Sequence, residues 1–331
     1  MLLGLETFSY HLAFAYGEMD IFGFIERTAS LGLDGVEINV EGNDLCHLGD
    51  DDPGFLRDVR ALTEQHGLFV ELDTCNTDPA NLTRVLRLCE ALGADRLRVY
   101  SSVGGDARQE MRKAIDDFRQ VVGLAGDLNV KIGFENHEYE TSRDVLDVVR
   151  QVNSEYLGAH VDTGNSMMVW EDPLQAVEAM APYAVSTHFK DHMVVSLNGR
   201  PMIVGVPLGE GSIDCGACLR ILEERSSLER INIEVCYGYV APFRVPESDG
   251  AGARLGAGAF RVVPPPYAPE IVAPYLLRAA GQEGELRSFA WQELAAMPSA
   301  ESERCELVRL QDRAVAASVE YVRQLNGQDR E

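Results

Sequence analysis

The chain has 331 residues, of which 46% are hydrophobic and 25% are charged, as in an ordinary globular protein. Its 29 basic and 53 acidic residues give a formal net charge of −24, which argues against nucleic acid or an anionic membrane as a partner. No apolar run approaches the roughly 20 residues of a membrane-spanning helix, and the N-terminus lacks the basic flank of a signal peptide. Seven scattered cysteines argue against a disulfide framework. We therefore expect a cytoplasmic protein.

Short apolar or β-branched runs alternate with amphipathic helical patterns along most of the chain. Helical patterns, several of which stop at a glycine, cover 21–32, 53–67, 81–93 and 107–128 among others. Eight strands are predicted, at 3–9, 35–39, 69–73, 96–102, 131–135, 157–162, 184–189 and 231–235. Such alternation implies parallel strands joined by helices, and eight repeats predict closure into a (β/α)8 TIM barrel formed as a single domain over 1–331.

The last part of the chain departs from this alternation. Residues 236–298 are rich in glycine, proline and alanine, and they form an insertion of about sixty positions in the last strand-to-helix connection. We interpret the insertion as a lid or a partner-docking segment above the catalytic end of the barrel. A plain surface loop is the alternative, although five aromatic residues argue against simple disorder. A clear helical pattern over 299–325 then supplies the eighth helix.

Four of the predicted strands end in a residue that can bind a divalent metal. These residues are Glu135, Asp162, His188 and Glu234, one from each of the last four strands. In a parallel barrel the C-terminal strand ends meet at the face that carries the active site, so the four side chains are expected to converge. Three carboxylates and one imidazole suit Mn²⁺, Mg²⁺ or Co²⁺ better than a closed structural zinc site.

The same residues carry a family resemblance. The motifs ENH (135–137), DTGN (162–165), HFKD (188–191), PLGEGSID (207–214) and IEV (233–235) resemble, in order and spacing, the sugar phosphate isomerase/epimerase superfamily with the xylose isomerase-like TIM barrel. The resemblance implies that Glu135, Asp162, His188 and Glu234 bind one divalent cation, with Mn²⁺ the leading choice and Mg²⁺ or Co²⁺ the alternatives. It also implies that the two glutamates face each other across the substrate as acid and base.

Two further polar residues follow these ligands at a spacing of two. His137 and Lys190 point to the same side as Glu135 and His188 if the extended backbone continues. We assign His137 as a second base or substrate contact, and Lys190 as the residue that neutralises oxyanion charge. A loop residue or an ion-pair partner is the alternative for each.

Other inward-facing positions are candidates for substrate binding. His160 precedes Asp162 by two and is either a substrate contact or a packed histidine of the barrel interior. Asn165 stands where many members of the superfamily carry a substrate-binding histidine. Arg98 in the fourth predicted strand also lines the same interior as a candidate substrate contact, with a paired structural charge as the other interpretation.

The sequence leaves more than one reaction open. The leading hypothesis is a metal-dependent isomerase or epimerase that removes a proton next to the carbonyl of a keto sugar or cyclitol, giving a metal-stabilised enediolate. The alternative is a lyase, resembling either the dehydratases or the large subunit of C-glycoside deglycosidases, which act on 3-oxo-glycosides. The long insertion favours this alternative. A non-enzymatic binding protein is disfavoured because all four ligands are present. We expect a small sugar or glycoside substrate and an oligomer, with a small second subunit in the deglycosidase case.

Overall fold

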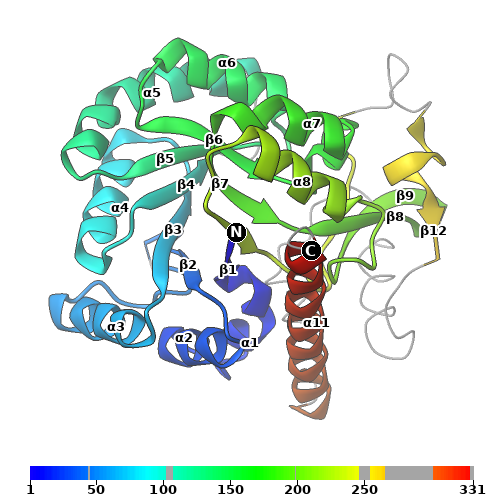
Figure 1. The fold of residues 1–331 in the computed structure, drawn as a ribbon, viewed down its shortest axis with the longest axis horizontal. Coiled ribbons are helices and arrows are strands. Elements are labelled where there is room, and N and C mark those ends of the chain that lie inside the picture. Colours follow the sequence, from blue (N-terminus) through cyan, green and yellow to red (C-terminus); the bar gives the residue numbers. More distant parts are fainter. Residues whose placement is uncertain (44, 102–106, 198, 246–253, 265–300, 329–331) are drawn as a thin grey trace.

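Eight parallel strands close into a barrel, which confirms the predicted (β/α)8 fold (Figure 1). The computed structural model describes residues 1–43, 45–101, 107–197, 199–245, 254–264 and 301–328. Around the barrel the order is β1-β10-β7-β6-β5-β4-β3-β2. The barrel strands are β1 (Leu2–Glu6), β2 (Gly35–Asn39), β3 (Phe69–Cys75), β4 (Arg96–Tyr100), β5 (Lys131–Glu135), β6 (Leu157–Asp162), β7 (Ala184–Phe189) and β10 (Arg230–Ile233).

Helices follow the barrel strands and form the outer ring (Figure 1). Local sequence sets where several of them begin: Asp52, Asp78 and Asp172 each accept hydrogen bonds from the first turn, and each is followed by a proline at the first helical position. The outer helices are α2 (Ile21–Ser30), α3 (Pro53–His66), α4 (Pro79–Leu92), α5 (Ala107–Asp127), α6 (Ser142–Val152), α7 (Pro173–Met180), α8 (Cys215–Arg225) and α11 (Glu301–Gln328). Short helical segments are η1 (Thr7–Tyr10), α1 (His11–Ala15), η2 (Asn165–Val169) and η3 (Ala181–Tyr183).

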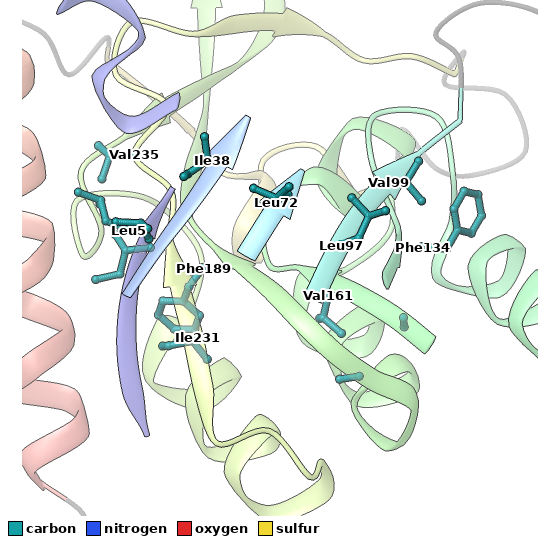
Figure 2. Close-up of a cluster of buried hydrophobic side chains, with 14 of the residues drawn as sticks. Leu5, Ile38, Leu72, Leu97, Val99, Phe134, Val161, Phe189, Ile231 and Val235 are labelled. Carbon is teal, nitrogen blue, oxygen red and sulfur yellow. The ribbon is translucent and has the colours of Figure 1, made fainter. Parts of the chain in front are cut away.

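The main hydrophobic core lies between the sheet and these helices, as the close-up in Figure 2 shows. Side chains alternate along each strand, so one set faces the helices and the next faces the barrel interior. Leu5, Ile38, Leu72, Leu97 and Phe134 belong to the outward set, and all five are fully buried. Burying a side chain of this size stabilises the fold by roughly 1.5–3 kcal/mol. This apolar ring holds the strands in the register that aligns their C-terminal ends.

The barrel interior, by contrast, is closed at its N-terminal end by one aromatic ring. The ring of Phe69 fills the space left by Gly4 and Gly35, where an added Cβ atom would overlap it. The guanidinium of Arg230 lies over the same ring, 4.4 Å from its centroid. Glycine is therefore needed at these two inward positions because the ring approaches the backbone so closely.

A buried polar network, which we call the lower layer, lies next to this plug. Glu71 accepts hydrogen bonds from Ser186, from Arg230 Nε at 2.5 Å and from Asn232 Nδ2 at 3.0 Å. Asn232 Nδ2 also donates to Glu37 Oε2 at 2.6 Å. These contacts join β3 and β2 to β7 and β10 across the barrel, so the network ties together strands that are not neighbours.

A second sheet extends the barrel on one side, to the right in Figure 1. It contains β8 (Asp191–Leu197), β9 (Arg200–Val206), β11 (Val240–Pro242) and β12 (Val262–Val263), in the order β11-β9-β8-β12. The β8–β9 hairpin is not predicted from the sequence pattern, in which the departure from the barrel alternation begins only after residue 235. Most of the segment 236–298, including 246–253 and 265–298, lies outside the described residues.

Aromatic stacking attaches this second sheet to the barrel. Trp170, which follows η2, stacks on Phe243 with ring centroids 3.6 Å apart and an interplanar angle of 6°. Its ring also lies 5.7 Å from Phe260, in the short helix η5 (Gly258–Phe260), and its Nε1 donates to the Val245 carbonyl at 3.0 Å. The two ends of the described chain meet elsewhere, where the N-terminal amine donates to Asn326 at 2.9 Å. None of the described helices combines the length and apolarity required to span a membrane.

Candidate active site

The four side chains expected to bind metal converge at the C-terminal end of the barrel. Donor atoms of Glu135, Asp162 and His188 all lie within 4.8 Å of one another. Glu234 joins them, since its Oε2 lies 2.9 Å from His188 Nδ1. Glu135 and Asp162 end β5 and β6, His188 lies in β7, and Glu234 follows β10, so neighbouring strands bring them together. All four side chains are buried.

The donor atoms at this point fit a divalent cation. Asp162 Oδ2, Glu234 Oε2 and both ring nitrogens of His188 are buried, and their close contacts are with one another, with Lys190 and with neighbouring carboxylates. Two ligands on opposite sides of a cation bound at about 2.1 Å lie about 4.2 Å apart. A spread of 4.8 Å therefore requires movements of less than an ångström. Three buried acidic side chains meet at this point, and a cation would offset the repulsion between their charges.

A lysine contributes positive charge to this cluster. Lys190 Nζ lies 2.8 Å from Asp162 Oδ2 and 2.5 Å from Glu234 Oε2. Burial alone would raise the pKa of Glu234, but Lys190 and then His188 outweigh it and hold that pKa well below its usual range. Burial raises the pKa of Asp162 to about 7 despite the same lysine. The predicted position of Lys190 beside the ligands is thus observed, with two carboxylate partners.

Glu135 is held by two side chains from other elements. Arg98 Nη2 lies 2.5 Å from Glu135 Oε2, and Asn165 Nδ2 donates to Glu135 Oε1 at 3.3 Å. Burial would raise the pKa of Glu135, yet the Arg98 guanidinium keeps it well below the usual value. Both Arg98 and Asn165 line the pocket, where we expected substrate contacts, and both also orient this carboxylate.

The two remaining candidate histidines differ in position. His137 lines the pocket and stacks on Tyr100 with ring centroids 3.9 Å apart. Burial lowers the pKa of His137 to about 4, so the imidazole is neutral near pH 7. His160 is fully buried, meets the ring of His188 edge on at 4.2 Å, and is not among the described side chains that line the pocket. This position favours a packed interior histidine over a substrate contact for His160.

The pocket above the cluster has a volume of about 300 Å³. Its lining includes Glu234, Lys190 and His188 together with side chains that the sequence analysis did not assign to the site. Those from the barrel strands sit at inward positions of apolar runs, whereas Tyr239 and Cys236 come from the segment after β10. Cys236 Sγ lies 3.3 Å from Glu234 Oε1. The additional lining residues are Glu6, Phe8, Asn39, Glu41, Cys46, Asp73, Tyr100, Glu138, His192, Cys236 and Tyr239.

Tyr239 and a nearby arginine bind the loop that follows β5. The hydroxyl of Tyr239 donates to Glu138 Oε1, and Arg244 forms an ion pair with Glu138 Oε2. Glu138 is next to His137 in the chain, so these contacts connect the segment after β10 to the pocket wall that carries His137. Part of the predicted insertion therefore helps to form the pocket.

Comparison with known proteins gives the family. The family model described as xylose isomerase-like TIM barrel matches residues 25–255. The 3-oxo-isoapionate decarboxylase of Pectobacterium atrosepticum is 27% identical over 223 residues, which cover 66% of this chain and 79% of that protein.

Solved structures show the same fold at low sequence identity. The D-psicose 3-epimerase of Clostridium cellulolyticum H10, solved with D-tagatose, superposes with a TM-score of 0.62 at 15% identity, covering 98% of this chain and 99% of that one. The IolI protein, solved with a zinc atom, gives a TM-score of 0.58 at 16% identity, covering 72% of this chain and 90% of that one. The family match, supported by this shared fold, identifies the chain as a member of the xylose isomerase-like TIM barrel family.

Proposed function

We propose that this chain is a divalent-metal-dependent isomerase or epimerase that moves a proton next to the carbonyl of a keto sugar or cyclitol. The observation that carries the proposal is the convergence of the buried side chains of Glu135, Asp162, His188 and Glu234 at one point. Mn²⁺ suits this set of oxygen and imidazole donors best, and Mg²⁺ and Co²⁺ are the alternatives. The D-psicose 3-epimerase that shares the fold supports the reaction class.

Each residue of the cluster has a separate role in such a reaction. When bound, a divalent cation supplies Lewis-acid stabilisation of the negative charge that develops on the substrate oxygens. Glu234 lines the pocket and is ionised beside Lys190, so it is the carboxylate positioned to take the proton. Glu135, held by Arg98, is positioned to return a proton from the other side. Lys190 supplies a further positive charge near the developing oxyanion.

His137 offers a neutral imidazole at the pocket wall. Because its Nδ1 makes no hydrogen bond with described residues, it is available to a substrate hydroxyl. Stacking on Tyr100 fixes the plane of the ring. We assign His137 to substrate orientation, or to proton transfer with a hydroxyl, rather than to metal binding.

A lyase is the second candidate, because the decarboxylase relative shares 27% identity over 223 residues with this chain. Decarboxylation and dehydration, like isomerisation, develop negative charge on the carbon and oxygen atoms next to a carbonyl. The same cluster of residues can therefore serve either outcome. The deglycosidase version of this alternative, with a 3-oxo-glycoside substrate and a small second subunit, stays a prediction.

Hydrogen exchange from solvent separates the two candidates. The Mn²⁺-loaded protein is incubated in D₂O with neutral ketoses, an inosose, a sugar-derived 3-oxo acid and a 3-oxo-glycoside, and the products are followed by NMR and mass spectrometry. Deuterium entering next to the carbonyl, with every other group retained, supports the isomerase or epimerase. Release of CO₂, water or an aglycone supports the lyase. Turnover that persists after complete chelation of metal, shown by elemental analysis, rules out both.

A further inference from the structure

The half of the barrel that does not carry the metal-binding candidates forms its own wall of the pocket. The first four strands contribute Glu6 from β1, Asn39 from β2, Asp73 from β3 and Arg98 from β4, and all four side chains line the pocket. These positions lie at or near the C-terminal ends of their strands. The wall therefore faces any substrate whose carbonyl lies at the cluster of Glu135 and its partners.

Asp73 is held in place but is not fully satisfied. Its Oδ1 accepts from Asn39 Nδ2 at 2.7 Å and lies 3.1 Å from Arg98 Nη1. Its Oδ2 makes no hydrogen bond with described residues, although the side chain is only 1% exposed. Asn39 is itself fixed, since its Oδ1 accepts from the Glu41 amide at 3.0 Å. A buried carboxylate oxygen without a donor, in a residue that lines a cavity, indicates a ligand hydroxyl.

The charge of the pocket restricts what that ligand carries. Among the described lining residues other than the candidate ligand His188, the cations are Arg98 and Lys190. Arg98 is committed to Glu135 and Asp73, and Lys190 to Asp162 and Glu234. A phosphate or a second carboxylate would have to displace one of these partners and would lie beside the carboxylate of Glu234, whose pKa Lys190 holds low. The lining acids are Glu6, Glu41, Asp73, Glu138 and Glu234, and burial raises the pKa of Glu6, Glu41 and Asp73.

We infer that Asp73, fixed by Asn39 and Arg98, is a subsite for the hydroxyl groups of an uncharged polyhydroxy ketone, and that the pocket rejects phosphorylated and carboxylated substrates. This inference rests on the proposed function, which sets the reacting carbons beside Glu135 and Glu234. Arg98 spans from Glu135 to Asp73, so hydroxyls further along the same substrate reach the subsite. The inference also favours isomerisation over decarboxylation, because a substrate that loses CO₂ must carry a carboxylate.

Matched pairs of neutral and phosphorylated sugars test the inference. Metal content is measured first, because failure to load Mn²⁺ contradicts the proposed function and not the subsite. Isothermal titration of the loaded protein then compares D-fructose with D-fructose 6-phosphate and D-tagatose with D-tagatose 6-phosphate. We expect a neutral ketose to bind more than about tenfold more tightly than its phosphorylated partner. The inference is overturned if a phosphorylated sugar binds as tightly, or if neither neutral ketose binds the loaded protein.

Two variants locate the effect at this wall. Asp73→Asn keeps the shape of the side chain, and we expect it to weaken neutral ketose binding about tenfold while Mn²⁺ content is unchanged. Asp117→Asn is the matched control, because Asp117 is a buried acid of α5 that accepts from Thr77 at 2.8 Å outside the pocket. If Asp73→Asn does not fold, Glu41→Gln is tested instead. We expect it to reduce the difference in binding affinity between neutral and phosphorylated ligands. Wild-type binding by Asp73→Asn, or an unchanged difference in Glu41→Gln, contradicts the subsite.

Discussion

Two layers of charged side chains lie inside the same barrel, and the partners of their central carboxylates differ. In the lower layer, Glu71 accepts hydrogen bonds from a hydroxyl, a guanidinium and an amide. The mouth is the C-terminal end of the barrel, where Asp162 and Glu234 lie. There, Asp162 Oδ2 and Glu234 Oε2 are also buried and form ion pairs with Lys190, and Glu234 Oε2 lies 2.9 Å from His188 Nδ1. The two layers use the same kinds of residue.

The difference teaches that burial of charge alone does not mark a site. A buried carboxylate with complete partners acts as a scaffold, and removing one partner leaves the others without compensation. A buried carboxylate whose partners are an ammonium and another candidate ligand can exchange those contacts for a bound cation or substrate. The two layers should therefore respond to mutation in opposite ways, the mouth through activity and the lower layer through stability.

The largest expected effect is the loss of activity when Glu234 at the mouth is substituted. We expect Glu234→Gln to lower kcat about 10²- to 10⁴-fold, because the amide cannot accept the proton. Thermal unfolding of the metal-free protein should change little, since Lys190 keeps Asp162 as its partner. Steady-state kinetics and calorimetry measure both effects, with Glu229→Gln at an exposed position as the matched control. A strongly destabilised variant that retains activity would reverse the assignment of the layers.

Removal of Glu71 should produce the next largest effect, and it should appear as lost stability. We expect Glu71→Ala to lower the free energy of unfolding by about 3–5 kcal/mol, because Arg230 and Asn232 lose a buried charged partner. Urea denaturation measures the loss, and Glu71→Gln, which keeps the shape, should lose less. If Glu71→Ala unfolds at the wild-type urea concentration, the lower layer does not act as a scaffold.

Metal binding should stabilise the fold only through the candidate ligands at the C-terminal end of the barrel. Mn²⁺ at a hundred times its Kd should raise the free energy of unfolding of the wild type by about 2.7 kcal/mol. Asp162→Asn keeps the oxygen that accepts from the Gly164 and Asn165 amides but loses a charged donor for the metal, so this gain should shrink or vanish. Thermal shift with and without Mn²⁺ makes the comparison. An equal shift in both proteins would argue against Asp162 as a ligand.

The smallest effect should come from a residue that only orients a ligand. Asn165 Nδ2 lies 3.3 Å from Glu135 Oε1, so Asn165→Ala should weaken Mn²⁺ binding about tenfold without destabilising the lower layer. Titration with Mn²⁺ and urea denaturation of the same variant test the two halves of this expectation. If the affinity for Mn²⁺ is unchanged, Asn165 does not orient a metal ligand, and its role is to contact substrate.

Much of the barrel could be predicted because alternation and strand ends are local properties. The predicted strands 35–39, 131–135, 157–162 and 184–189 have the same bounds in the structure. The first predicted strand, 3–9, instead ends at Glu6, whose carboxylate accepts from the Phe8 amide and starts the short helix η1. One side chain can thus end a strand that the apolar pattern would extend.

Two features escaped prediction for different physical reasons. The β8–β9 hairpin follows β7 with only Lys190 between, and the sequence pattern predicts no strand between residues 189 and 231. The dipeptide Asn198–Gly199 between the two strands is the signal that could have indicated a hairpin. Asp73 and Glu6 were missed because an inward acid in a strand looks the same in sequence whether it is paired, like Glu71, or faces a cavity. Only contacts across the barrel distinguish these cases.

The aromatic plug at the N-terminal end of the barrel bears on the order of events during turnover. Phe69 and Arg230 fill the barrel interior at that end. Substrate and product therefore enter and leave through the opposite face. Each product molecule must leave before the next substrate enters, so slow departure makes product a competitive inhibitor. Progress curves should then bend well before the reaction reaches equilibrium.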